Sequence, residues 1–366
     1  MKKLITNIVL LGLPATVFLI FGSVVLYYLD VNGDTISTEE IIKKNPTIYG
    51  TAYVDYNQPF KYNKVSKLKN TDVLVIGGSR SMQFNSLMFT KSFYNGGGLI
   101  LNFADLEFCS DMIINTKPKI IIIGLEQYFF NPSFSLFNTL SNYEADKKNN
   151  KIGIIGNVIK DLIARRLKLS ELLKEYPAEK KLALGLRAIL HGGGFGSDGK
   201  QIYPLNVSQL ASPSILFKDI ENRINAKNNR YEAIENVSSL AIKRLEIFLL
   251  KCDKANIRVI GYLPPWPIQI QEKLKNDGHY DKYFEALPQK IVPIFQKNSS
   301  SLFFNFTDIS NIGGVDEEFY DGHHPSEKIY CRKLKYIYDH SNEEIQSAIN
   351  LEYINSIINN NKRFGL

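Results

Sequence analysis

Short apolar runs alternate with segments of helical periodicity over most of the chain. Five runs, rich in isoleucine, valine and leucine, are predicted to be strands: residues 73–76, 99–103, 120–123, 257–263 and 302–306. Runs of this length and composition are typical of strands buried on both faces of a parallel sheet. A helix is predicted over about 234–250, before the fourth strand. Strands joined by helical crossovers predict a three-layer α/β/α fold with a five-stranded parallel sheet.

The N-terminal segment predicts a membrane anchor. Between Lys3 and Asp30 there are 26 residues without a charge. As a helix they would span about 39 Å, more than the roughly 30 Å hydrocarbon core of a bilayer. Lys2 and Lys3 precede the segment and acidic residues follow it, so the positive-inside rule places the N-terminus in the cytoplasm. We expect residues 1–30 to be a single-pass signal-anchor in the cell membrane, with the rest extracytoplasmic; a cleaved signal peptide is the alternative.

The remaining chain is divided by pattern and polarity. Residues 31–70 are polar and are predicted to form an extracytoplasmic tether, followed by one domain over 71–340 and a C-terminal helix over 341–366. The domain carries a predicted insertion at about 135–230, because roughly 100 residues separate the third strand from the next helix, far more than a crossover needs.

The predicted insertion contains two distinctive stretches. A helix begins near Ile154, with isoleucine, valine and leucine on one face and Lys160, Arg165, Arg166 and Lys168 on the other. The basic face is an ordinary solvated surface, or it contacts an anionic polymer or a partner near lipid headgroups. The glycine-rich stretch 191–196 is predicted to be a flexible loop or lid, because no Lys-Ser/Thr follows it to make a phosphate cradle.

Composition narrows the class of partner. The chain has 366 residues, 44% of them apolar and 22% charged, and a formal net charge of +7. A basic protein can bind nucleic acid, an anionic polymer or a membrane surface. No arginine-rich run, zinc-ligand spacing or aromatic RNA-binding pattern is present, so nucleic acid is not expected. The three cysteines, Cys109, Cys252 and Cys331, are widely spaced and predict core positions rather than a disulfide framework.

The end of the first predicted strand carries a candidate nucleophile. The run at 73–76 stops at Gly77-Gly78-Ser79. Glycine allows a sharp reversal and close backbone approach, which would present Ser79 at the carboxyl end of the sheet, where open α/β folds bind ligands. The alternative is an ordinary strand-to-helix turn in which Ser79 caps the next helix.

A candidate base lies near the other end of the chain. Asp321 and His324 are three residues apart across a turn, and a carboxylate that fixes an imidazole lets it accept a serine proton. Pro325 suits the first position of a helix, so His324 is predicted to be the N-cap, although histidine is a poor cap. The alternative is that His323 and His324 are surface histidines or half a metal site; no cluster of metal-ligand spacing accompanies them, and no metal or cofactor is expected.

These two end motifs resemble the SGNH (GDSL-like) hydrolase superfamily, in which a Gly-x-Ser follows the first strand and an Asp-x-x-His lies near the C-terminus. The chain looks most like the membrane-anchored branch, the alginate O-acetylation proteins and the D-alanyl-lipoteichoic acid transfer protein. The resemblance covers roughly 70–130 and 230–340. It implies that Ser79 is the nucleophile, His324 the base and Asp321 the residue that orients it.

The resemblance also implies an oxyanion hole. Family members use the N–H of the serine, a glycine after the second strand and an asparagine after the third. Here the corresponding segments read Asn102-Phe103-Ala104 and Gly124-Leu125-Glu126, so Gly78, Asn102, Ala104 and Glu126 are the expected oxyanion and substrate residues. Ala104 keeps a backbone N–H, but an ionised Glu126 cannot donate a hydrogen bond.

The fourth predicted strand ends in Pro264-Pro265-Trp266-Pro267, at the same edge of the sheet. The only tryptophan of the chain, Trp266, is a candidate floor for a sugar or acyl pocket. The alternative is a rigid turn with an aromatic ring packed beneath it.

Three functions follow from these expectations. The first is acyl transfer, most simply O-acetyl transfer, through an acyl-Ser79 to a cell-surface polysaccharide or teichoic-type polymer. In the families that the chain resembles, a multi-pass membrane acyltransferase is thought to supply the acyl group, and such a protein is the expected partner. The second is ester hydrolysis at the same site. The third is a membrane-anchored scaffold without activity.

Overall fold

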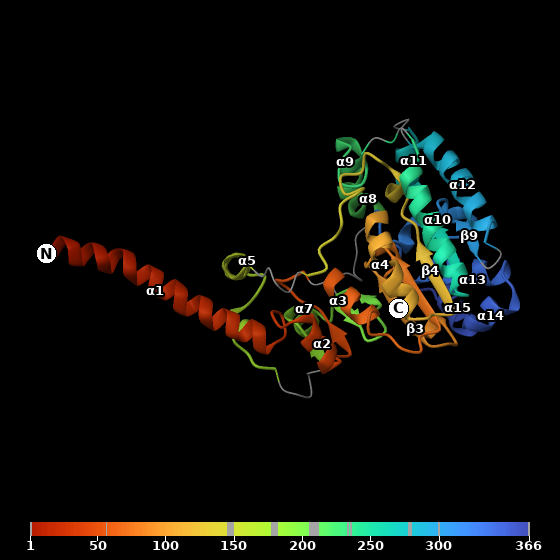
Figure 1. Ribbon diagram of the computed structural model, residues 1–366. Coiled ribbons are helices and arrows are strands. Elements are labelled where there is room, and N and C mark those ends of the chain that lie inside the picture. Colours follow the sequence, from red (N-terminus) through yellow and green to blue (C-terminus); the bar gives the residue numbers. More distant parts are fainter. Residues whose placement is uncertain are drawn as a thin grey trace. The chain divides into compact units, whose positions relative to one another are not determined.

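The computed structural model describes residues 2–364 apart from 56, 145–149, 177–181, 205–211, 233, 235, 277–279 and 299–300, with only the backbone described for 2–11. The chain forms two compact units, each considered by itself (Figure 1). The anchor unit comprises Met1–Phe60, Glu144–Ser197 and Ile202–Leu205. The sheet unit comprises Lys61–Tyr143, Asp198–Gln201 and Asn206–Leu366. The predicted insertion at 135–230 is therefore shared between the units, and several of its residues lie outside the described part.

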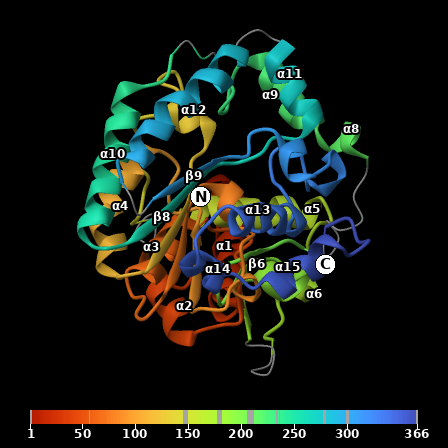
Figure 2. The ribbon, with the colours of Figure 1, turned by 90° about the vertical axis from the view of Figure 1, so that its right-hand side faces the viewer.

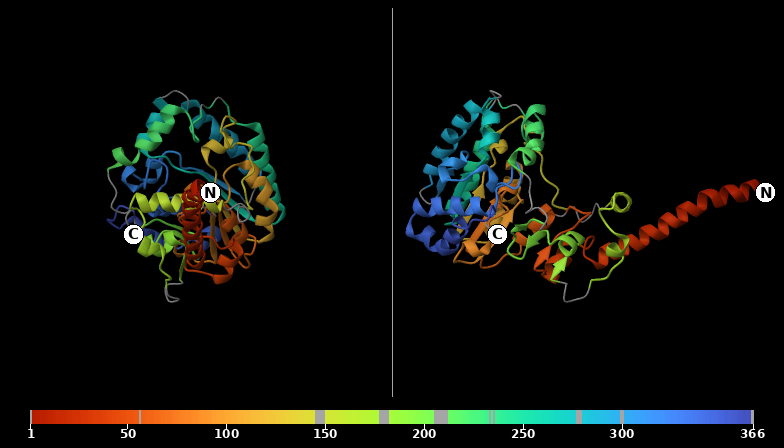
Figure 3. Two further views of the ribbon diagram at one scale, coloured as in Figure 1. Left: turned by 90° about the vertical axis from the view of Figure 1, so that its left-hand side faces the viewer. Right: turned by 180° about the vertical axis from the view of Figure 1, so that it is seen from behind.

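The anchor unit begins with one long helix, α1 (Lys2–Val31), visible from two sides in Figure 3. Within α1, Gly12–Val31 has a mean hydropathy of 1.8 and is long and apolar enough to cross a membrane. The other helices of this unit are α2 (Thr38–Lys44), α5 (Lys151–Ile163), α6 (Leu169–Leu172) and α7 (Leu186–His191). The predicted tether at 31–70 thus contains a helix, α2. Ser37 caps this helix by accepting the N–H of Glu40.

A small sheet completes the anchor unit, in the order β5-β1-β6-β7. Its strands are β1 (Ile48–Tyr49), β5 (Ala183–Leu184), β6 (Gly194–Gly196) and β7 (Gln201–Ile202). The prediction of a flexible loop or lid at 191–196 is wrong. His191 ends α7, and β6 pairs with β1, where a Cβ on Gly194 would collide with the backbone of Tyr49. The glycines are needed for close strand approach and not for mobility.

The sheet unit contains the predicted five-stranded parallel sheet. Its strands are β2 (Val73–Gly77), β3 (Phe93–Gly97), β4 (Ile120–Gly124), β8 (Arg258–Leu263) and β9 (Leu302–Asn305). Their order is β3-β2-β4-β8-β9, and every neighbouring pair is parallel. The chain order reverses between β2 and β4, and ligands of open α/β sheets bind at the carboxyl ends of strands at such a point.

Both faces of this sheet are covered. Leu74 and Ile76 of β2 belong to one apolar cluster, whereas Val73 and Val75 belong to the other, as strand alternation requires. The first cluster includes residues of α4 (Phe103–Asn115), α10 (Ser239–Lys254), α11 (Ile268–Asn276) and α12 (Asp281–Gln296). The second includes residues of α13 (Glu327–Asp339), α14 (Glu343–Ala348) and α15 (Leu351–Ile358). Figure 2 shows these helices around the sheet. The remaining helices are α3 (Asn57–Val65), α8 (Pro213–Leu216) and α9 (Lys218–Ala226).

Two element predictions are wrong. Residues 99–103 are not the second strand; that strand is β3, and 99–102 lead into α4. The sequence of β3, Phe-Tyr-Asn-Gly-Gly, has the composition of a turn, but a Cβ on Gly96 would lie 2.9 Å from the carbonyl oxygen of Val75. Only glycine allows the strands to pack this closely. The C-terminal helix is also divided, because α14 ends at Ala348, Ile349 is extended, and Asn350 caps the start of α15.

Candidate active site

Two glycines place Ser79 at the carboxyl end of β2. Gly77 has φ +132°, a conformation that other residues rarely adopt, and a Cβ on it would lie 2.8 Å from the carbonyl oxygen of Gly124. A Cβ on Gly78 would lie 2.8 Å from a carboxylate oxygen of Glu126. The chain then makes a single 3₁₀ turn, Ser79–Ser81. Ser79 is half-buried at the sheet edge, between β2 and β4.

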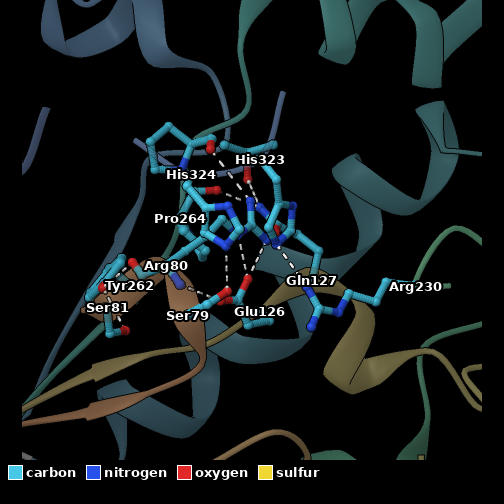
Figure 4. Close-up of polar contacts among 12 residues, drawn as sticks. Ser79, Arg80, Ser81, Glu126, Gln127, Arg230, Tyr262, Pro264, His323 and His324 are labelled. Carbon is cyan, nitrogen blue, oxygen red and sulfur yellow. Dashed lines mark hydrogen bonds and ion pairs between the residues drawn. The ribbon is translucent and has the colours of Figure 1, made fainter. Parts of the chain in front are cut away.

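A turn near the C-terminus brings His324 to this serine. Oδ1 of Asp321 accepts the backbone N–H groups of His323 and His324 at 2.7 and 2.6 Å, which leaves Oδ2 for the His324 ring at 2.8 Å from Nδ1. On the other side of the ring, Nε2 lies 2.9 Å from Ser79 Oγ (Figure 4). The three side chains that the sequence predicts to act together are therefore in one hydrogen-bonded chain.

The electrostatics of the turn favour one tautomer of His324. Burial alone would raise the pKa of Asp321, but the nearby His324 and the hydrogen bonds from its ring and from two backbone N–H groups hold that pKa below its usual value. An ionised carboxylate only accepts hydrogen bonds, so the ring proton must be on Nδ1. Nε2 is then free to accept the hydroxyl proton of Ser79, which is what general-base activation of a serine requires.

His324 has no capping role. The N-cap of α13 is Ser326, and Pro325 lies before the helix, so the prediction that His324 caps this helix is wrong. The turn extends two residues beyond the predicted helix start because the N–H of Ser326 bonds to the carbonyl oxygen of Glu318. His324 is consequently oriented by Asp321 and remains partly accessible, with 26% of its side chain exposed.

The neighbouring histidine has a different environment. His323 is 2% exposed, and its ring nitrogens lie 3.3 Å from the Tyr231 hydroxyl and 3.4 Å from Arg230 Nη1. Burial and the positive charges of Arg80 and Arg230 hold its pKa well below the ordinary value of histidine. His323 is therefore a neutral, packed side chain, and the two histidines that the sequence leaves as a pair have separate roles.

A buried ion pair lies beside the serine, and it involves a residue that the sequence analysis missed. Arg80 is fully buried; it forms an ion pair with Glu126, and its Nη2 lies 2.6 Å from the side-chain oxygen of Gln127. Its guanidinium also stacks on Trp266, 4.1 Å from the ring centroid. The signal was available, because a charged residue directly after a buried strand and a glycine turn needs a partner at the same sheet edge.

This ion pair changes the expected roles of two residues. Glu126 is bound to Arg80 through Nε and to the backbone N–H of Arg80 at 3.3 Å, and it is fully buried. Trp266 is 2% exposed, packs between Arg80 and His323, and its ring N–H has no hydrogen-bond partner among the described residues. Glu126 and Trp266 therefore pack in the interior against Arg80 of the serine turn. The buried indole has no exposed face that could bind a sugar or acyl group.

The expected donors on the second segment also have other partners. Asn102 is the N-cap of α4, and its side-chain oxygen accepts the N–H groups of Ala104 and Asp105 at 2.8 and 3.0 Å. Its amide nitrogen donates to the carbonyl oxygens of Leu136 and Thr139. The Asn102 amide group and the Ala104 backbone N–H are therefore both engaged at the start of α4, and neither is available to an oxyanion at Ser79.

Among the residues that the structure describes, no group of three or more histidine, cysteine, aspartate or glutamate side chains could hold a metal ion. The three cysteines are buried and unpaired. No protein-family model matches this chain, and no curated protein matches its sequence.

Proposed function

We propose that the protein is a membrane-anchored serine acyltransferase that acts outside the cytoplasm on a cell-surface polysaccharide or teichoic-type polymer. The observation that carries the proposal is the chain from Ser79 Oγ through His324 to Asp321, with links of 2.9 and 2.8 Å. It lies at the carboxyl end of β2, at the reversal of strand order. Nucleophile, base and orienting carboxylate are the minimum set for covalent acyl transfer.

In the proposed reaction, Ser79 Oγ attacks the carbonyl carbon of an acyl donor while His324 Nε2 takes the hydroxyl proton. The tetrahedral intermediate collapses, the bond to the leaving group breaks, and His324 returns the proton to that group. A polymer hydroxyl then gives its proton to His324 and attacks the acyl-Ser79 carbonyl, which releases the free serine. Asp321 stabilises the imidazolium that forms in both halves of the reaction.

The fold is consistent with the three-layer SGNH arrangement that this proposal includes. The first strand in chain order lies between the second and third, the serine follows that first strand, and the Asp-x-x-His turn follows the last. Helices contribute to apolar clusters on both faces of the sheet. The order of the serine and the Asp-x-x-His turn along the chain is the one that the resemblance implies.

The proposed oxyanion hole starts from the backbone N–H of Ser79. In place of the family's asparagine, Glu126 is paired with Arg80 and also accepts the Arg80 backbone N–H, so the hole depends on the N–H of Ser79 and on the field of the buried guanidinium. An incomplete hole would lower turnover, and the inactive scaffold remains an outcome of the test below.

An esterase is the second candidate, supported by the accessibility of the site. Ser79 is half-buried and 26% of the His324 side chain is exposed, so water can reach the serine and its base. The transferase requires that water attacks acyl-Ser79 slowly, whereas the esterase requires that it attacks fast.

The anchor completes the proposal. Helix α1 would span the membrane with its N-terminus in the cytoplasm, because Lys2 and Lys3 precede the apolar segment. One span cannot carry an activated acyl group across the bilayer, so a multi-pass membrane acyltransferase is the proposed donor partner. A reporter that is active only outside the cytoplasm, fused after Leu366, should be active; a reporter signal from the cytoplasm would contradict the orientation.

The activity is tested with full-length protein and a chromogenic acetyl ester. Ser79→Ala and His324→Ala should each reduce turnover on the order of 10⁴-fold or more, because the triad acts as a unit. His323→Ala is the matched control at the adjacent position and should cost much less, with folding checked by Trp266 fluorescence. If His323→Ala is inactive and His324→Ala is active, the assignment of the base is wrong.

Mass spectrometry of acyl-Ser79 then separates the candidates. The acetylated protein is mixed with water alone or with candidate cell-surface glycans, and the loss of the acetyl group is followed. Faster loss with a glycan supports the transferase, whereas equal loss supports the esterase. If no acyl-Ser79 forms from any ester, the scaffold reading replaces both.

A further inference from the structure

The anchor helix is crossed by a second helix of the same unit. Gly22 of α1 is buried against α5, and a Cβ on it would lie 2.8 Å from Ile155. Val25 and Leu29 of α1 are 0% exposed and share an apolar cluster with α5, α6 and α7. Figure 1 shows α5 end-on beside α1, which runs lengthwise in the same view, so the two helix axes cross. A helix that crosses a membrane-spanning helix in this way runs along the membrane surface.

The position of the crossing matches the thickness of a bilayer. Helix α1 has 30 residues, about 45 Å at 1.5 Å per residue, which exceeds the roughly 30 Å hydrocarbon core. From Lys3 to Gly22 the rise is about 28 Å. One side of α1 is buried from Gly22 onwards, at Gly22, Val25 and Leu29, whereas Leu13, Val17, Leu19 and Ile20 are 58–66% exposed. Among the described side chains, the part of α1 that is exposed on all sides therefore ends where α5 begins to cover one side of the helix.

Helix α5 is more apolar than its contact with α1 requires. Ile154, Ile155 and Val158 are buried, but Ile152 and Ile163 are 73% and 78% exposed. Ile152, Gly156, Ile159 and Ile163 follow one another at spacings of four, three and four residues, which places them on one stripe of the helix. We call these four residues the α5 stripe.

The direction of the α5 stripe is fixed by the opposite edge of the helix. Asp161 is nine residues from Ile152, about two and a half turns, so the two lie on opposite sides of α5. The Asp161 carboxylate accepts the Tyr53 hydroxyl at 3.1 Å, and Tyr53 belongs to the folded base of the unit, where its N–H bonds to Asp34. The α5 stripe consequently faces away from this base, toward the lipid-exposed part of α1.

The charge around α5 is that of a helix at an anionic surface. From 151 to 174 the chain has six lysine and arginine residues and two acidic residues. Asp161 pairs with Arg166 and Glu171 with Lys168, while for Lys160 and Arg165 no ion pair is recorded among the described residues. A helix with an exposed apolar stripe and basic neighbours binds in the headgroup layer of a bilayer.

We propose that α5 is a second membrane contact: it lies in the outer headgroup layer, with the α5 stripe in the acyl boundary and its basic residues at anionic lipid phosphates. The inference rests on the proposed membrane span of α1 and adds to it that the anchor unit is held against the lipid surface by two crossed helices. A single helix leaves a domain free to rotate about its tether, whereas two crossed helices fix the base of the unit in the plane of the membrane.

The test uses full-length protein in vesicles of phosphatidylcholine with phosphatidylglycerol. Ile152→Cys and Ile163→Cys are labelled in separate proteins with an environment-sensitive fluorophore; the native cysteines are all buried, which favours labelling at the new site. Asn157→Cys, exposed on the polar side of the same helix, is the matched control. We expect a blue shift and quenching by a shallow lipid-borne spin label at 152 and 163, and neither effect at 157.

The outcomes separate the two levels of the proposal. If the protein does not resist carbonate extraction from the vesicles, the proposed span of α1 fails. If it resists extraction but the labels at 152 and 163 behave like the label at 157, α5 does not contact lipid and the inference is overturned. A response to soluble polygalacturonate, without quenching by lipid, would assign α5 to an anionic polymer and also overturn it. Arg165→Glu should weaken the quenching of the labels at 152 and 163, and the difference from the unsubstituted protein should grow as the phosphatidylglycerol fraction is raised.

Discussion

The buried pair of Arg80 and Glu126 gives the sharpest prediction, for Glu126→Gln. Both side chains have 0% exposure, and the guanidinium has no route to solvent. The substitution keeps the shape of the side chain but leaves the charge of Arg80 unbalanced, and breaking a buried pair in this way costs about 3–5 kcal/mol. With a urea m-value of about 2–3 kcal/mol/M, the unfolding midpoint of the sheet unit should fall by about 1–2.5 M.

Trp266 makes this measurement local. It is the only tryptophan in the chain and stacks on Arg80, so its fluorescence reports on the sheet unit and on the ion pair itself. The matched control is the double variant Arg80→Met with Glu126→Leu, which removes both charges and should recover most of the loss. If Glu126→Gln unfolds at the wild-type midpoint, or if the double variant is less stable than the single one, the pair does not support the serine turn as argued.

The remaining predictions concern other buried groups. Burial raises the pKa of Asp34 to about 6, although the backbone N–H groups that donate to its carboxylate act in the opposite direction. The folded state therefore binds this proton more tightly than the unfolded state, and the anchor unit should gain stability, at most about 3 kcal/mol, as pH falls from 6 toward 4. Hydrogen exchange should show this dependence on pH, and Asp34→Asn should abolish it. Gly124→Ala should destabilise the sheet unit by about 1–3 kcal/mol, because the new Cβ would overlap Ser81 Oγ. Adding Ser81→Ala should restore part of the lost stability. An unchanged urea midpoint for Gly124→Ala would contradict the argument. Burial and nearby Arg80 hold the pKa of Lys333 well below its usual value, so this lysine destabilises the folded protein at neutral pH, and does so less as pH rises. Lys333→Met should therefore raise the urea midpoint of unfolding followed by Trp266 fluorescence. A lower midpoint would show that the contacts of Lys333 with aromatic rings contribute more than its burial costs.

The sequence determined the features that are written locally. Uninterrupted apolar runs predicted β2, β4 and β8, since a strand buried on both faces has no polar side, and a similar run predicted the edge strand β9. Helical periodicity predicted α5 and its buried face. The sequence also identified Ser79, Asp321 and His324 as candidates, because a glycine turn after a strand and an Asp-x-x-His turn each need only a few adjacent residues to form.

Other features were decided by neighbours that are distant along the chain. Ser79 and His324 are 245 residues apart, and only the packing of α13 against the sheet determines that their side chains meet. The glycines of β3 look like a turn in sequence, but the backbone of β2 requires them. Asn102 has the position of an oxyanion residue, yet the first turn of α4 needs its side chain as a cap. The partner of Arg80, Glu126, follows a different strand, β4. A buried charge is stable only beside such a partner, so the role of Arg80 depends on the tertiary structure and not on the local sequence pattern.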